Sequence, residues 1–241
     1  MSPTARSNKA RKERERKARQ DAKRLERQRK RGPRDGLIER ETETREQRHR
    51  YLIVCEGEKT EPNYFRAFPE YTLVYAIQVE GAGANTTSVV ERAIELRDEV
   101  GGYEDDEVWA VFDRDSFPPE RFNEALLLAK NRGIRVAYSN EAFELWYLLH
   151  FAYRDTGLSR TQYKSKLTRS LGERYRKNSE QMYDKLLPMQ EQAIQNASRL
   201  LASHTPLVPE SCNPSTTVHL LVLRLNGTPA DDEAEILDNL I

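Results

Sequence analysis

The chain has 241 residues, of which 32% are charged and 37% hydrophobic, with 39 basic and 39 acidic side chains. None of its apolar runs approaches the roughly 18–20 residues that cross a bilayer, and no hydrophobic stretch follows the basic N-terminus as it would in a secretory signal. Its two cysteines, Cys55 and Cys212, exclude a disulfide framework, and its four histidines show no zinc-ligand spacing. We therefore expect a cytoplasmic protein with no membrane partner.

The two kinds of charge are unevenly distributed along the chain. Residues 1–34 hold 15 Lys and Arg against 4 Asp and Glu, a net charge of +11, so the remaining residues carry −11. Because the basic segment has almost no apolar residue to bury, we expect a disordered arm over residues 1–47. Such an arm can bind nucleic-acid phosphates without sequence preference, or it can be a solubilising extension that contacts nothing specific.

Short apolar segments alternate with helical patterns from residue 50 onwards. Buried strands are predicted for the apolar segments Tyr51–Cys55, Tyr71–Val79, Val108–Phe112 and Ile134–Tyr138. Helices are predicted between them at Glu61–Phe68, with Thr60 as N-cap, at Thr87–Val100 and at Pro118–Asn131. This alternation is typical of an α/β protein, here a parallel four-stranded sheet flanked by helices.

The second half of the chain reads as mostly helical. We predict a helix at Glu141–Phe151, two or three helices within 160–204 with a break near Pro188, a proline-rich loop over 205–214, and a helix or strand over 217–225. The expected organisation is therefore an arm over 1–47, a catalytic core over 48–152, a helical extension packing on that core over 153–228, and a loose acidic tail over 229–241.

Acidic residues follow the first and third predicted strands directly. Glu56 comes after the first strand, and Asp113 and Asp115 come after the third, where alternate residues of an extended segment point the same way. Gly57 permits a tight turn that lets Glu56 face the same pocket. Converging carboxylates repel one another unless a hard cation neutralises them, which favours one or two Mg²⁺ (or Mn²⁺) ions. An Asp pair after a strand also occurs in ordinary loops and helix caps.

The combination resembles the Toprim domain of topoisomerases, primases and OLD-family nucleases, and over about residues 48–226 the chain is similar to RloB-like proteins of bacterial and archaeal defence and restriction loci. The segments that carry the resemblance are Ile53–Phe65, Phe112–Asp115, Ser139-Asn140 with Phe143–Trp146 and His150-Phe151, and Asn213–Thr216. It implies that Glu56, Asp113 and Asp115 bind Mg²⁺. OLD-type enzymes have a second acidic residue one turn later, which points to Glu61.

These observations together predict a Mg²⁺-dependent Toprim-type endonuclease that cleaves DNA or RNA, tRNA included, in defence against phage or foreign DNA. The resemblance also implies an ABC-type ATPase partner encoded nearby, since this chain has no G-x-x-x-x-G-K-[ST] loop. The alternative is a catalytically silent adaptor that docks nucleic acid or a partner. A strand-passing or primase-like enzyme is disfavoured, because the chain has neither room for a strand gate nor a zinc module.

Other candidates have both a functional and a structural interpretation. Glu144 lies in an apolar helix, so it is either exposed or buried with a metal or a basic partner that assists the site. Lys59 is either a contact for the scissile phosphate or a surface lysine. His150 and Trp146 are more simply core residues.

A basic and aromatic stretch follows residue 153. Its cations form the predicted nucleic-acid surface, and its tyrosines (Tyr153, Tyr163, Tyr175 and Tyr183) either stack bases or belong to amphipathic helices. The cations are Arg154, Arg160, Lys164, Lys166, Arg169, Arg174, Arg176 and Lys177.

Overall fold

The computed structural model describes residues 50–68, 74–79, 86–100, 106–114 and 119–227, all of which belong to one compact unit, Glu46–Ile241. The predicted arm over 1–47, the predicted tail over 229–241 and Asp115 lie outside the described residues. In the described part of the chain, no helix is both long enough and apolar enough to cross a bilayer.

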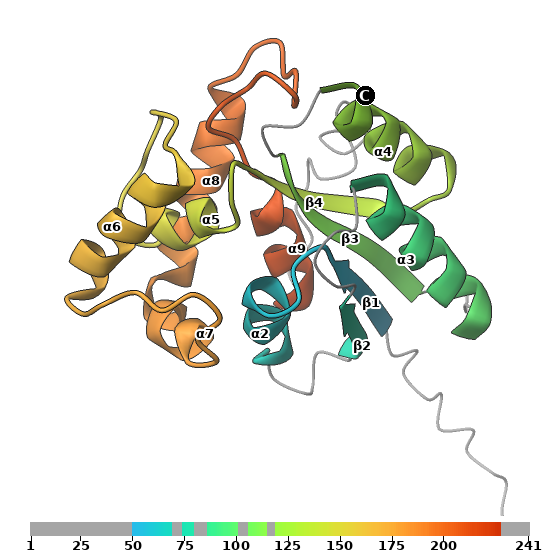
Figure 1. The fold of residues 1–241 in the computed structure, drawn as a ribbon, viewed down its shortest axis with the longest axis horizontal. Coiled ribbons are helices and arrows are strands. Elements are labelled where there is room, and N and C mark those ends of the chain that lie inside the picture. The colour runs from blue at the N-terminus through green and yellow to red at the C-terminus, as the bar shows by residue number, and fades with distance from the viewer. Residues whose placement is uncertain (1–49, 69–73, 80–85, 101–105, 115–118, 228–241) are drawn as a thin grey trace, which may run out of the picture. The chain divides into compact units, whose positions relative to one another are not determined.

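A parallel sheet forms the centre of the molecule, with the strand order β2-β1-β3-β4 (Figure 1). Its strands are β1 (Arg50–Cys55), β2 (Val74–Val79), β3 (Asp106–Arg114) and β4 (Arg135–Asn140). Every pairing is parallel, and each strand overlaps a predicted one. The predicted mixed α/β class with a parallel sheet flanked by helices is therefore confirmed.

The helices connect and cover the strands. They are α2 (Thr60–Arg66), α3 (Thr86–Val100), α4 (Pro119–Asn131), α5 (Glu144–Leu149), α6 (Arg160–Leu171), α7 (Met182–Leu186), the 3₁₀ helix η1 (Leu187–Met189), α8 (Gln190–Ala202) and α9 (Val218–Leu225). The break predicted near Pro188 is the short η1 between α7 and α8. The segment predicted as a helix or strand over 217–225 is helical.

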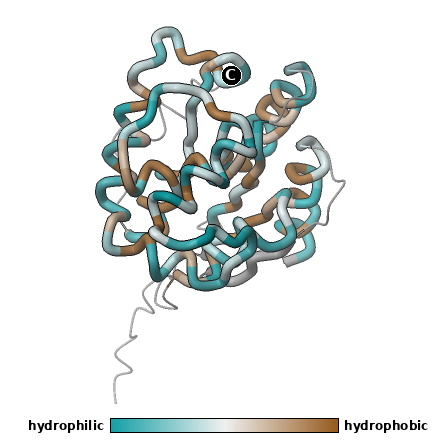
Figure 2. The backbone as a smooth tube through the Cα atoms, turned by 60° about the vertical axis from the view of Figure 1, so that its left-hand side comes forward, coloured by the Kyte–Doolittle hydropathy of each residue, from teal (hydrophilic) through white to brown (hydrophobic). Residues whose placement is uncertain are grey.

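Two hydrophobic clusters lie on opposite faces of the sheet, because successive strand residues point to opposite sides. Val54 and Ala110 face one cluster, which α3 and α4 complete, whereas Ile53 and Trp109 face the other, which the remaining helices complete. Figure 1 shows α3 and α4 on one side of the sheet and α2 and α9 on the other. The alternating colours along the helices in Figure 2 are those of amphipathic helices that bury one face.

The helices that follow residue 153 share the core of the second face. Leu167 of α6, Leu186 of α7 and Ala197 of α8 belong to the same buried cluster as Ile53 of β1. Tyr64 of α2 lies at the centre of this cluster and makes edge-on contacts with Phe143, Trp146 and Tyr183. The C-terminal helices thus hold α2, and with it the chain that leaves β1.

The carboxyl end of β4 pairs with the segment before α9 through buried polar side chains, here called the polar clamp: Tyr138, Ser139, Asn140, Ser215, Thr216 and Thr217. Asn140 Oδ1 accepts hydrogen bonds from the backbone N–H and from the hydroxyl of Ser215. Thr217 Oγ1 accepts from the N–H of Tyr138 at 3.0 Å and lies 3.2 Å from the Val136 carbonyl, to which it donates.

Residues of the polar clamp also contact the start of α9. Thr217 occupies the N-cap position of α9 and makes no side-chain cap hydrogen bond, whereas Thr216 Oγ1 accepts from the N–H of Val218 at 3.3 Å. The hydroxyls of Thr216 and Ser139 lie 2.8 Å apart and hydrogen-bond each other. These polar residues therefore supply hydrogen-bond partners for backbone groups along the outer edge of β4, which has no further strand beside it among the described residues.

Candidate functional site

Glu56 and Asp113 meet at the carboxyl ends of β1 and β3. The two strands are neighbours in register, with Cys55 opposite Val111, so Glu56 reaches the same edge as Asp113. The N–H of Glu56 donates to the Val111 carbonyl at 2.9 Å, and the N–H of Asp113 donates to Glu56 Oε2 at 3.0 Å. Asp115, the third predicted ligand, lies outside the described residues.

Glu61 folds back from the start of α2 against the turn that follows Glu56. A Cβ atom at Gly57 would overlap the Glu61 carboxylate, so any larger residue there would displace that carboxylate from its present position. Glu61 is only 8% exposed, and its Oε2 makes no hydrogen bond with any described residue. A buried carboxylate oxygen without a partner is costly, which makes it a candidate ligand atom.

Glu144, the first residue of α5, faces the protein interior. It is 8% exposed, and its Oε1 accepts a hydrogen bond from the Tyr175 hydroxyl at 3.0 Å. The interpretation of Glu144 as an exposed helix residue is therefore wrong. Its hydrogen-bond partner among the described residues is a tyrosine hydroxyl, where the sequence suggested a metal or a basic side chain.

These acidic residues form the carboxylate cluster: Glu56, Glu61, Asp113 and Glu144. Burial is the main cause that raises the pKa of Asp113 well above its usual value, and the charges of Glu61, Glu56 and Glu144 raise it further. The pKa of Glu61 is raised by burial and then by Glu144, and that of Glu56 by burial and then by Glu61. The protein thus holds several carboxylates close together, and neighbouring negative charge opposes the ionisation of Asp113, Glu61 and Glu56.

Two cations partly offset this repulsion. Arg160, at the start of α6, places Nη2 4.0 Å from Asp113 Oδ2 while its Nε donates to the Glu141 carbonyl at 2.9 Å. Arg160 lowers the pKa of Glu56, Glu61 and Asp113, and Lys177 lowers that of Glu61. Both cations were predicted only as nucleic-acid contacts.

Lys59, the cation predicted to steady a phosphate, lies apart from these contacts. Its side chain is exposed and makes no hydrogen bond or ion pair with another described residue. It occupies the N-cap position of α2, which corrects the prediction that Thr60 caps this helix. Thr60 instead is the first residue of α2, and its hydroxyl donates to Asn178 Oδ1 at 2.8 Å.

The carboxylate cluster suits a hard cation in its chemistry. Carboxylate oxygens are preferred ligands of Mg²⁺, and a divalent ion would relieve both the mutual repulsion and the unpaired Oε2 of Glu61. Within the described residues, no group of three or more His, Cys, Asp or Glu side chains is already arranged as a metal site. Asp115, the third predicted ligand, is not among these residues. One of the Glu56 carboxylate oxygens, Oε2, already accepts a hydrogen bond from the N–H of Asp113.

A loop between α6 and α7, residues 172–181 and here called the basic loop, is tied to the carboxylate cluster at one point and to α2 at another. Tyr175 binds Glu144, and Asn178 accepts from Thr60 and, through its carbonyl, from Asn63 Nδ2 at 3.0 Å. Sequence reasoning missed the roles of Tyr175 and Asn178. No local signal could reveal them, because the partners are 31 and more than 100 residues apart.

The cations of the predicted nucleic-acid surface differ in how far their side chains are exposed. Lys164 and Arg169 are exposed on α6, Lys166 is half-buried there, and the half-buried Arg154 has a buried Nε without a partner among the described residues. The cations of the basic loop, Arg174, Arg176 and Lys177, are all exposed.

The tyrosines of this stretch belong to the core, so the prediction that they stack bases is wrong for most of them. Tyr163, Tyr175 and Tyr183 are 1–4% exposed. Tyr153 is half-buried, and the guanidinium of Arg199 lies 4.0 Å from the centre of its ring. The expected core positions of Trp146 and His150 are confirmed.

Comparison with known families gives a match to the RloB-like protein family over residues 51–225, which is more than half of the chain. The chain belongs to the RloB-like family. The matched region contains both strands that carry the carboxylate cluster, together with the basic loop and the polar clamp. Neither a curated protein nor a solved structure matches this RloB-like protein.

Proposed function

We propose that this RloB-like protein is a Mg²⁺-dependent, Toprim-type endonuclease that hydrolyses phosphodiester bonds in DNA or RNA, tRNA included. The observation that carries the proposal is the carboxylate cluster at the carboxyl ends of β1 and β3, where burial and neighbouring charges oppose ionisation. Folding alone would not favour such an arrangement, whereas a divalent cation and a phosphate would make use of it.

The residues divide into roles by their position. Glu56, Asp113 and Asp115 would hold one ion, and Glu61 with Glu144 would assist or hold a second. A bound Mg²⁺ would polarise the phosphoryl oxygens and lower the pKa of a bound water. Tyr175 holds Glu144 in place through its hydroxyl, and the small size of Gly57 lets Glu61 approach. The guanidinium of Arg160 lies 4.0 Å from the Asp113 carboxylate, where it would attract the substrate phosphate.

The biological setting is a further part of the proposal. The resemblance to RloB-like proteins of defence loci supports a role against phage or foreign DNA and an ABC-type ATPase partner. Co-purification of the tagged chain with the products of neighbouring genes tests the partner, and recovery of a nucleotide-binding ATPase is the expected result.

Metal binding and cleavage test the central proposal together. The protein, stripped of metal with EDTA, is titrated with Mg²⁺ and Mn²⁺ in a calorimeter and then incubated with plasmid, single-stranded DNA and total tRNA. We expect metal binding and metal-dependent cleavage in the wild type and neither in Asp113→Asn. Asp184→Asn, an equivalent change on the exposed side of α7, serves as the matched control and keeps both activities.

The possible outcomes separate the candidates. An absence of both metal binding and cleavage would reject the nuclease and favour a silent adaptor on the same scaffold. Metal binding without cleavage would support the metal site and show that hydrolysis requires another component, for which the ATPase is the first candidate to add.

A further inference from the structure

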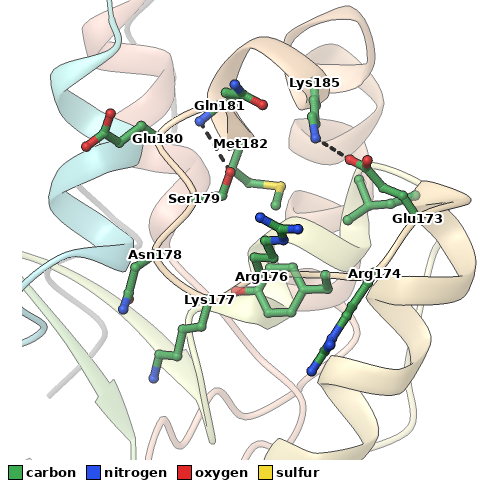
Figure 3. A pocket seen from close by; sticks show the side chains of 12 residues that line it. Glu173, Arg174, Arg176, Lys177, Asn178, Ser179, Glu180, Gln181, Met182 and Lys185 are labelled. Atoms are coloured by element: carbon green, nitrogen blue, oxygen red, sulfur yellow. Dashed lines mark hydrogen bonds and ion pairs between the residues drawn. The ribbon is translucent and has the colours of Figure 1, made fainter.

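A pocket of about 750 Å³ lies between the basic loop and α7. Figure 3 shows the Arg176 guanidinium in the middle of the view near Met182, with the side chains of Arg174 and Lys177 pointing to different sides of it and the ion pair between Lys185 and Glu173 at the upper right. A volume of this size is that of a small-ligand pocket, which a segment of one or two nucleotides would fill.

The pocket carries excess positive charge on an otherwise acidic body. Its charged lining residues are Glu173, Arg174, Arg176, Lys177, Glu180 and Lys185, which sum to a net charge of +2. Lys185 is paired with Glu173, whereas the side chains of the three loop cations are exposed and form no hydrogen bond or ion pair with another described residue. Lys177 acts on Glu61 and Arg176 on Glu173 only through their charges, so these cations remain available to an anionic ligand.

The basic loop is held where one of its cations, Lys177, acts on the carboxylate cluster by lowering the pKa of Glu61. Tyr175 is fixed to Glu144 on one side, and Asn178 is fixed to Thr60 on the other. Arg176 and Lys177 lie between these two attachments, so their backbone is positioned by both. Asn178 has a φ of 69°, a left-handed conformation that Asn tolerates better than most residues and that turns the chain toward α2.

The lining of the pocket favours phosphates over bases. Its aromatic residue, Tyr175, and its methionine, Met182, are each 3% exposed, so neither presents a surface on which a base could stack. The remaining uncharged polar side chains, those of Asn178, Ser179 and Gln181, are small donors and acceptors. Recognition here would therefore depend on backbone charge and would vary little with sequence.

We propose that the basic loop and its pocket bind the phosphate backbone of a single-stranded nucleic acid, with Arg176 and Lys177 contacting phosphates beside the one that enters the carboxylate cluster. This inference rests on the proposed nuclease function, because it assigns a substrate to the same site. The strand runs from the pocket past Lys177 to the carboxylates, and Arg174 adds a third positive charge at the pocket wall.

Binding measured in EDTA tests the loop separately from hydrolysis. Short labelled single strands of DNA and RNA are titrated with the full-length protein over a series of KCl concentrations. We expect Arg176→Ala/Lys177→Ala to bind at least about tenfold more weakly than the wild type. Its salt dependence should fall by about 1.4 in log–log slope, which corresponds to two lost phosphate contacts on a single strand. The slope change is informative even if residues 1–34 add affinity of their own.

The matched control removes two exposed cations from the other face of the sheet. Arg121→Ala/Arg132→Ala, at α4 and directly after it, has the same change in charge and should leave affinity and slope as in the wild type. Circular dichroism melting of both variants verifies that they are folded; the side chains removed are exposed in each.

Three results would overturn the inference. The first is a wild type that binds neither single strand in EDTA, and the second is a loop variant whose affinity and slope match those of the control. Tighter binding of a duplex than of its separate strands, with the same dependence on Arg176 and Lys177, would also reject it. If the loop variant loses binding while the wild type cleaves nothing, the loop is a binding site and the nuclease proposal alone fails.

Discussion

The carboxylate cluster and the polar clamp lie at the same edge of the sheet and differ in how their polar groups are satisfied. In the clamp, hydroxyls and an amide pair with one another and with the backbone of β4. In the cluster, Glu61 Oε2 lacks a partner among the described residues, and the charges of Glu61, Glu56 and Glu144 raise the pKa of Asp113. The satisfied clamp therefore serves the fold, whereas the unpaired Glu61 Oε2, set among other carboxylates, is available to a ligand.

The same comparison predicts opposite responses to substitution. A residue of the clamp stabilises the native state, so removing its hydrogen-bonding atom should lower the free energy of unfolding. A residue of the cluster destabilises the metal-free protein, so removing its charge should cost activity without costing stability.

The largest effect is expected for Asp113→Asn. We expect the metal-dependent cleavage rate to fall by more than about 1,000-fold, equivalent to about 4 kcal/mol of transition-state stabilisation, because an essential ligand is lost. The free energy of unfolding in EDTA should stay the same or rise. Cleavage rates and urea denaturation measure the two quantities, and a variant that is unstable as well as inactive would contradict this division.

The free energy of unfolding is expected to depend on pH through His219, which lies close in sequence to the polar clamp. Burial lowers the pKa of His219, two residues after Thr217, to about 4 from its usual 6.5. Between these values the unfolded chain binds a proton that the folded protein excludes. Above pH 6.5, His219 therefore does not reduce the free energy of unfolding. As the pH falls from 6.5 to 4, protonation of His219 in the unfolded chain lowers the free energy of unfolding by about 3 kcal/mol.

His219→Gln provides the comparison for this pH response. Urea denaturation at a series of pH values should show the advantage of the wild type over the variant shrinking as the solution becomes more acidic. Direct titration of the imidazole by NMR gives an independent check. A His219 that titrates near pH 6.5 in the folded protein would contradict the prediction.

Thr217→Val tests the clamp itself. The substitution keeps the shape of the side chain but removes the hydroxyl that accepts from the N–H of Tyr138, which is then buried without a partner. We expect the free energy of unfolding to fall by about 2 kcal/mol. Thr217→Ser, which keeps the hydroxyl, is the control and should lose clearly less. A Val variant as stable as the wild type, or a Ser variant that loses more than the Val variant, would contradict a stabilising role for the hydroxyl.

The smallest effect is expected for Glu61→Gln. Removing one charge from the carboxylate cluster should raise the free energy of unfolding in EDTA by about 1 kcal/mol, or about 2–4 °C in melting temperature for a chain of this size. Addition of Mg²⁺ should stabilise the wild type more than the variant. A lower melting temperature for Glu61→Gln in EDTA would show that this carboxylate supports the fold.

Local sequence patterns predicted the secondary structure and part of the site. Hydrophobic runs and turn residues located each strand to within a few residues, because a buried strand must be apolar on both faces. Glu56 and Asp113 were predicted to meet because both follow strands of one parallel sheet, and such strands end at the same edge. The sequence also placed Trp146 and His150 in the core correctly.

Only the tertiary structure decided the strand order β2-β1-β3-β4, the partner of Glu144 and the position of the basic loop. It also reassigned the tyrosines around that loop from an exposed surface to the core. Periodicity reports which face of an element is buried, but it carries no information about which distant element covers that face. Tyr175 therefore finds Glu144, and Asn178 finds Thr60, only when the C-terminal helices pack on α2 and α5.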